Sequence, residues 1–296
     1  MKLKFNFSHT PVLLQEVINL LVVEPGKFYI DATVGGGGHA IEICKKGGRV
    51  LGIDCDKEAI KAAGKNLKKF CPETRFKLVK GNFSDLKKIF IRYGKEKPAG
   101  ILFDLGASSY QLTSQNRGFS FQGNEALDMR MDLGLKINAK DLINKLSKEE
   151  LYEILAKFGG EERALPIAEA IVQSRREQPI ETTEQLVDII LKIKKPGGKI
   201  HPATKTFQAL RIAVNKEVEN LKTALPQAVT ILKRGGRLAV ISFHEGEDRI
   251  VKSFFRKMRT EERVIILTKK PITPSFKQVS ENRRSRSAKL RGVIKK

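Results

Sequence analysis

The side chains best placed for chemistry surround a glycine-rich turn near the N-terminus. Asp31 ends a short apolar stretch, and four consecutive glycines, three of them Gly36, Gly37 and Gly38, lead directly to His39. Glycine lets the backbone turn sharply and approach a ligand closely, while the free N–H groups of the following helix face that ligand. The spacing also fits the loose dinucleotide pattern G-x-G-x-x-A, which is weak evidence alone. The stretch predicts a nucleotide pocket lined by these five residues.

Two acids indicate which nucleotide fits. Asp54 follows the next apolar stretch, and an acid about 20 residues beyond the glycines binds ribose in dinucleotide sites, so Asp54 suits several cofactors. Asp31 discriminates between them, because a carboxylate before the turn repels a pyrophosphate but attracts an ammonium group. We therefore expect S-adenosyl-L-methionine as the cofactor, and an NAD-dependent enzyme is the disfavoured alternative.

The elements that position these residues alternate as in βαβ units. We expect strands at 28–32, 49–54, 76–80 and 100–105, with helices at 40–46 and 57–70 between them. Phe83 follows the third strand and Asp104 ends the fourth. Ligands of open α/β sheets bind outside the carboxyl ends of the strands, so Asp31, Asp54, Phe83 and Asp104 should meet at one edge.

The alternation stops after residue 112. Helical patterns, one of them opened by a capping box at Ser147 and Glu150, fill the chain to about residue 200. We expect a discontinuous sheet domain, 1–112 and 201–296, interrupted by an all-helical domain at 113–200, which is either a passive scaffold or a wall over the cleft.

The C-terminal part returns to the sheet. We expect a long helix to begin in the stretch 201–215, with a polar stripe, Thr204, Gln208, Arg211 and Asn215, that is interpreted as a solvated face. A strand at 238–243 ends at His244, and a strand at 264–267 is expected to complete the sheet. The stretch 282–291 is basic and serine-rich, which indicates a solvated tail or a phosphate-binding arm.

Composition points to a polyanionic partner. The 296 residues contain 56 Lys and Arg against 33 Asp and Glu, a formal charge of +23, which favours nucleic acid. The three cysteines form no C-x-x-C pair, so neither a zinc site nor a disulfide framework is expected. No signal peptide or membrane-length apolar run is evident, so we expect a cytoplasmic protein without membrane contact.

Several long blocks resemble one family, the bacterial 16S ribosomal RNA cytosine-N4 methyltransferases of the MraW type. The resemblance spans almost the whole chain and is carried by the blocks at 9–12, 81–84, 104–112, 117–121, 127–132, 160–163, 201–215, 241–249 and 286–291. Two positions depart from the usual pattern: Glu245-Gly246 replaces Ser-Leu, and Arg283 replaces Pro.

The resemblance implies a Rossmann-like methyltransferase sheet with an inserted helical domain, S-adenosyl-L-methionine as methyl donor, and N4 methylation of a decoding-centre cytidine in 16S ribosomal RNA of the small ribosomal subunit. The oligomeric state, monomer or homodimer, stays open. Donor contacts carried over by the resemblance are Gly37, Gly38, His39, Asp54, Phe83, Asp104 and Gln111.

Asp104 is the first candidate for catalysis, because an acceptor at the fourth strand end can draw on the N–H bonds of the cytosine amine. It can instead only hold the donor. Tyr110 is a weaker candidate for stacking on an extruded base, and His244 for contacting RNA or handling a proton. Two alternatives stay open: a cytosine-C5 methyltransferase, for which Cys71 would be the nucleophile, and a donor-binding RNA assembly factor without chemistry.

Overall fold

The computed structural model describes residues 11–107, 117–121, 123–197 and 200–296. The chain forms two compact units, one made of residues 1–108 and 218–296 and the other of residues 109–217. Residues 201–217, which the sequence analysis assigns to the sheet domain, fall in the second unit. Each unit is described by itself below.

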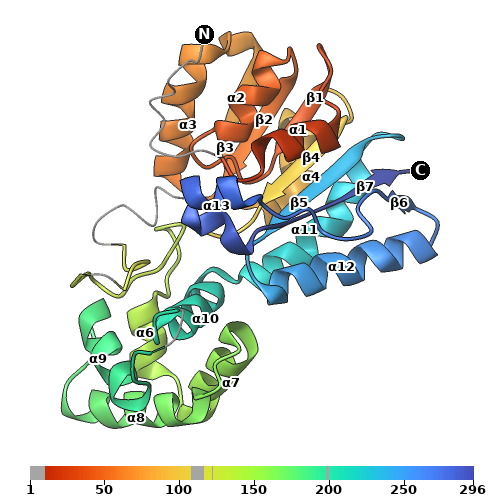
Figure 1. The fold of residues 1–296 in the computed structure, drawn as a ribbon. Coiled ribbons are helices and arrows are strands. Elements are labelled where there is room, and N and C mark those ends of the chain that lie inside the picture. Colours follow the sequence, from red (N-terminus) through yellow and green to blue (C-terminus); the bar gives the residue numbers. More distant parts are fainter. Residues whose placement is uncertain (1–10, 108–116, 122, 198–199) are drawn as a thin grey trace. The chain divides into compact units, whose positions relative to one another are not determined.

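The first unit is built on a sheet whose strand order is β3-β2-β1-β4-β5-β7-β6 (Figure 1). The first five strands in this order pair in parallel, and β7 pairs antiparallel with both β5 and β6. The strands are β1 (Phe28–Asp31), β2 (Arg49–Asp54), β3 (Phe76–Lys80), β4 (Gly100–Asp104), β5 (Arg237–Ser242), β6 (Val264–Ile266) and β7 (Lys289–Lys295). This doubly wound order confirms the predicted Rossmann-like α/β fold.

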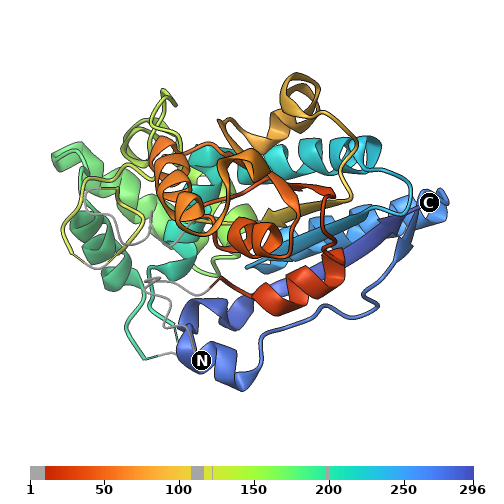
Figure 2. The same cartoon turned by 90° about the horizontal axis from the view of Figure 1, so that it is seen from above.

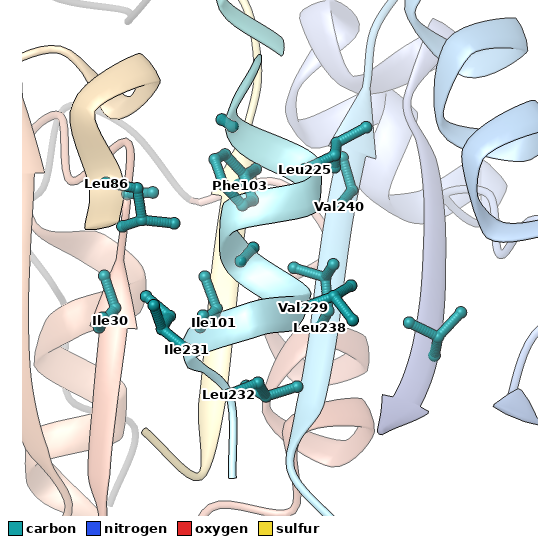
Figure 3. Packing of buried hydrophobic residues seen from close by; sticks show 14 of the residues in the cluster. Ile30, Leu86, Ile101, Phe103, Leu225, Val229, Ile231, Leu232, Leu238 and Val240 are labelled. Carbon is teal, nitrogen blue, oxygen red and sulfur yellow. The ribbon is translucent and has the colours of Figure 1, made fainter. Parts of the chain in front are cut away.

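Helices cover both faces of the sheet, as parallel strands require. One face carries α4 (Leu86–Tyr93), α11 (Glu217–Ile231) and α12 (Glu245–Thr260). Figure 3 shows Leu225 and Val229 of α11 against Phe103 of β4 and Val240 of β5. The opposite face carries α1 (Leu14–Leu21), α2 (Gly38–Lys45) and α3 (Lys57–Phe70), and Figure 2 shows α1 and α11 on opposite sides.

The prediction for the C-terminal stretch was wrong. Residues 289–291 are neither a solvated tail nor an arm, because they begin β7, which lies between β5 and β6. The strand β6 is the edge strand of the sheet, and β7, which the sequence did not predict, lies between it and β5. A short helix, α13 (Phe276–Glu281), and a 3₁₀ turn at Arg283–Ser287 precede β7. The basic residues concealed the strand, since Arg291 is buried and paired with Asp248 rather than exposed.

The second unit is helical in the part that the structure describes. Its helices are α6 (Ala139–Lys145), α7 (Lys148–Gly159), α8 (Ala164–Glu177), α9 (Thr183–Ile193) and α10 (Thr204–Asn215). The capping box predicted at Ser147 and Glu150 is present at the start of α7. Helix α10 packs against α7 and α6, which is why it belongs to this unit.

The polar stripe of α10 is not a solvated face. Asn215 is buried, accepts a 2.7 Å hydrogen bond from the Met131 N–H and donates at 2.8 Å to the Met129 carbonyl. Arg211 forms a two-pronged ion pair with Glu217 at 2.8 and 3.0 Å. Asn215 therefore fastens the segment around residues 129–131 to the end of α10.

Candidate active site

The strand register brings four of the predicted site residues to one edge of the sheet. Asp31, Asp54 and Asp104 end β1, β2 and β4, and Phe83 follows β3 in a 3₁₀ turn. In the ladders Asp31 pairs with Gly52 on one side and with Leu102 on the other. Parallel strands share one carboxyl edge, so the acids of three strands and the Phe83 turn lie along it.

The glycine turn is held by the second of these acids. The Gly35 N–H donates to Oδ2 of Asp54 at 2.9 Å, and the Asp56 N–H donates to Oδ1 at 2.9 Å. Gly37 has φ +87°, a left-handed conformation that favours glycine, and it is the residue before the first turn of α2. Asp54 therefore shapes the turn as well as facing the pocket edge.

Position 38 must be glycine because Pro11 packs directly against it. A Cβ at Gly38 would lie 2.2 Å from Cγ of Pro11, whereas a Cβ at Gly36 would meet nothing within 4 Å. Next to Gly38, the His39 ring is buried and its Nε2 lies 3.1 Å from the Val12 carbonyl. The predicted glycines thus have different roles: Gly38 admits the segment before α1, and Gly36 borders open space.

Burial dominates the electrostatics of the acids. It raises the pKa of Asp31 to about 7 and that of Asp54 to about 6, with the charge of Asp54 adding to the rise at Asp31. Burial also raises the pKa of Asp104 well above its ordinary value, and the nearby charges of Asp31 and Glu247 add to it. In the described part of the chain no Lys or Arg pairs with Asp31, Asp54 or Asp104.

Asp104 has one oxygen without a hydrogen-bond partner among the described residues. Its Oδ1 is buried and unpaired, its Oδ2 lies 3.7 Å from Nδ1 of His39, and its backbone N–H donates to Oγ1 of Thr33 at 2.6 Å. A buried, unpaired carboxylate oxygen is costly unless a ligand satisfies it. The edge is therefore built for a group that carries positive charge or N–H donors.

The first turn of α12 contributes a carboxylate that the sequence analysis did not select. Glu247 is 3% exposed, and its Oε2 accepts a 2.8 Å hydrogen bond from the Phe243 N–H. His244 caps α12 by accepting from the Glu247 N–H at 3.4 Å, and its Nε2 lies 3.2 Å from Oε1 of Glu247. The sequence signal that could have identified Glu247 is its position within one helical turn of the end of the fifth strand. His244 is tied to this acid, so its ring is positioned and only partly exposed.

The remaining predicted residues divide into two groups. Phe83 packs edge-on against Phe103, with ring centroids 5.6 Å apart, and keeps part of its surface exposed beside the strand ends. Tyr110 and Gln111 lie outside the described residues. Thr33, which holds the backbone of Asp104, was missed because a lone threonine in a turn gives no sequence signal.

Cys71, the nucleophile of the C5 alternative, lies away from this edge. It follows α3 before β3 begins, it is 6% exposed, and its Sγ contacts the Ile41 carbonyl at 3.9 Å. Burial raises the pKa of its thiol, so the reactive thiolate is disfavoured.

A doubly wound sheet with a glycine turn after β1, an acid after β2 and an unpaired acid after β4 defines a Rossmann-like methyltransferase. No helix among the described residues is long and apolar enough to cross a membrane. The chain belongs to the MraW methylase family, whose model matches residues 6–296.

Curated relatives cover nearly the whole chain. The "Ribosomal RNA small subunit methyltransferase H" of Coprothermobacter proteolyticus is 44% identical over 98% of this chain and 96% of its own length. The proteins of the same name from Sulfurihydrogenibium sp. and Persephonella marina are each 46% identical over 96% of this chain and 98% of theirs. Among solved structures, an rRNA methylase from Streptococcus thermophilus is 12% identical with a TM-score of 0.44, covering 95% of this chain and 93% of that one.

Proposed function

We propose that this protein transfers a methyl group from S-adenosyl-L-methionine to N4 of a cytidine in the 16S ribosomal RNA of the small subunit. The observation that carries the proposal is the set of carboxylates at one edge of the sheet, Asp31 buried and Asp54 and Asp104 partly buried, with no Lys or Arg partner in the described part of the chain. S-adenosyl-L-methionine carries an ammonium and a sulfonium, and both charges complement such an edge. Family membership and the names of the relatives support the same reaction class.

The residues of the first unit fit this donor. Asp31 suits the ammonium group and Asp54 the ribose hydroxyls, since a carboxylate accepts hydrogen bonds from both. Gly36 leaves room for close approach of a ligand to the backbone, because a Cβ there would meet nothing within 4 Å, and Gly37 supplies the left-handed φ of the turn. Phe83 is partly exposed beside the strand ends, and its ring is the proposed contact for the adenine. When bound, the donor supplies an electrophilic methyl on a positively charged sulfur.

Asp104 is the proposed acceptor for the reacting amine. The N4 lone pair of cytosine is conjugated into the ring, and an acceptor for its N–H bonds lets the nitrogen pyramidalise. The nitrogen then forms the new N–C bond as the C–S bond breaks, its electron pair passing to sulfur. The nitrogen becomes cationic and loses a proton, and the proposed acceptor of that proton is Oδ1 of Asp104, which has no hydrogen-bond partner among the described residues.

His39 is the side chain that faces the Asp104 carboxylate. Its Nε2 lies against the Val12 carbonyl and therefore carries the hydrogen, so its Nδ1 presents a lone pair toward Oδ2 of Asp104. Burial lowers the pKa of His39 to about 4, which keeps the ring neutral at neutral pH. His39 thus faces Asp104 as a neutral acceptor and does not compete as a cation for the same carboxylate.

We propose that the second unit recognises the RNA and that the excess of Lys and Arg over acids in the chain supports this binding. The chain has a formal charge of +23, and association with RNA phosphates follows from it. Tyr110 and Gln111 stay proposed contacts for the extruded base and the donor, and His244 a proposed contact for RNA. We place the reaction in the cytoplasm, and either a monomer or a homodimer is compatible with it.

Methyl transfer to small subunits tests the proposal. Tritiated donor is incubated with 30S subunits that lack the modification, and the labelled nucleotide is mapped by mass spectrometry of a digest. N4-methylcytidine at one decoding-centre position is expected. C5-methylcytidine would instead support the alternative enzyme, and donor binding without transfer would support an assembly factor.

A further inference from the structure

A groove on the first unit carries several cations that have no function in the proposed reaction. It has a volume of about 750 Å³ and lies between the second half of α12, β6 and the end of β7. We call it the α12 groove and define it by its charged side chains, Lys252, Arg256, Arg259, Glu262, Lys269 and Lys296. These five cations share the groove with one acid, and Arg291, the sixth cation of the lining, is paired with Asp248.

The cations of α12 lie on one face of the helix. Lys252, Arg256 and Arg259 follow at i, i+4 and i+7, and all three are exposed. Among the described residues none of them has a carboxylate within 4 Å, although the charge of Lys252 acts on Asp248, whereas the neighbouring Lys257 and Arg263 share Glu261 at 3.9 Å each. Like charges at this spacing repel each other, so an anion in the groove relieves the repulsion.

The wall of the groove is neutral and rigid. Arg291 of β7 binds Asp248 of α12 through two hydrogen bonds of 2.6 and 3.0 Å, and both side chains are buried. This pair holds α12 against β7, and the Asp248 carboxylate neutralises the charge of Arg291. Phe255 and Ile265 line the floor, with Ile265 52% exposed. The cations of the groove therefore project from a surface held by this pair. A sugar-phosphate backbone fits such a surface, with its phosphates at the cations and its sugars against the apolar residues.

The groove lies at a distance from the reacting atoms. Helix α12 begins beside His244 at the strand ends and runs 16 residues to Thr260, a length of about 24 Å at 1.5 Å per residue. An RNA strand that reaches both places therefore extends well beyond the target nucleotide. A short oligonucleotide around the cytidine fills only the reaction site.

We propose that the α12 groove binds the phosphate backbone of the substrate RNA about one helix length from the methylated cytidine. This inference rests on the proposed function for its choice of RNA. It makes the groove a determinant of affinity for long RNA or assembled subunits, while donor binding and the chemical step are independent of it.

The test compares two triple variants of equal charge. The groove variant is K252Q, R256Q and R259Q, and the control is K61Q, K65Q and K69Q on the exposed face of α3. The groove variant is expected to bind unmodified small subunits on the order of tenfold more weakly, and to lower the slope of log affinity against log salt by about 2 to 3. Its affinity for the donor and its kcat at saturating subunit should match those of the control.

The same binding measurement with polyuridine separates this inference from the proposed function. Failure of the unaltered protein to methylate subunits ends the proposed function, yet the groove inference still predicts weaker polyuridine binding by the groove variant alone. Equal losses in both triple variants, or an unchanged salt slope, would overturn the inference. Polyglutamate bound as tightly as polyuridine at the same salt would mark a protein-docking surface and overturn it as well.

Discussion

Oδ2 of Asp104 lies 3.7 Å from Nδ1 of His39, joining the end of β4 to the first turn of α2. Burial raises the pKa of Asp104 and lowers that of His39 to about 4, so at neutral pH and without a cation nearby both groups tend toward their neutral forms. A cation in the pocket favours ionised Asp104, because the attraction offsets the cost of burying its charge. Binding of the donor therefore prepares the acceptor.

Replacing Asp104 by asparagine removes the base but keeps the shape of the side chain. We expect kcat for methyl transfer to fall by roughly 10² to 10⁴, the range typical of a positioned acid or base. Donor affinity, measured by calorimetry, should change much less. If the variant keeps its full rate, Asp104 is not the acceptor; if only donor affinity falls, Asp104 holds the donor.

Donor affinity should rise with pH. Asp31 and Asp54 have pKa values raised to about 7 and about 6, so both are neutral below these values and ionised above them. A cationic ligand prefers the ionised forms, and one pKa unit corresponds to about 1.4 kcal/mol. Calorimetry at pH 5.5 and pH 7.5 is expected to show affinity on the order of tenfold higher at pH 7.5.

The matched variant for this prediction is Asp31→Asn. It should bind the donor more weakly at pH 7.5 and show a smaller pH dependence, because one of the carboxylates with a raised pKa is gone. An unaltered protein whose donor affinity is the same at both pH values would contradict the assignment of the carboxylates.

Gly38→Ala should destabilise the protein, while Gly36→Ala should not. The new Cβ at position 38 would lie 2.2 Å from Cγ of Pro11, and the segment holding the Val12 carbonyl must shift. Overpacking of this kind costs about 1–3 kcal/mol of unfolding free energy. Urea unfolding of both variants measures the difference, and equal stabilities would contradict the packing at Gly38.

Arg291→Met should strongly destabilise the sheet at β7. The change leaves the buried Asp248 carboxylate without the partner of its two hydrogen bonds of 2.6 and 3.0 Å, with only Lys289, at 3.8 Å, as a nearby cation. Breaking one side of such a pair costs about 3–5 kcal/mol. Lys257→Ala, which removes an exposed pair with Glu261, is the control and should change unfolding free energy by less than about 1 kcal/mol. Similar losses in both variants would contradict the buried position of β7.

The local elements of the sheet unit could be predicted from the sequence. Apolar strands ending in Asp31, Asp54 and Asp104 alternate with helices, and the parallel arrangement that follows places those acids at one edge. The reason is physical: strands buried on both faces are nearly all apolar, so each ending is visible as the first charged residue.

Only the tertiary structure decided the protonation of those acids and which residues lie next to them. The sequence cannot show that Glu247 comes from α12 to raise the pKa of Asp104, nor that His39 faces it through Nδ1. It also concealed β7, because a strand containing Arg291 looks solvated until Asp248, 43 residues away in the chain, neutralises it. Burial and long-range pairing determine charge states, and neither is a property of local sequence.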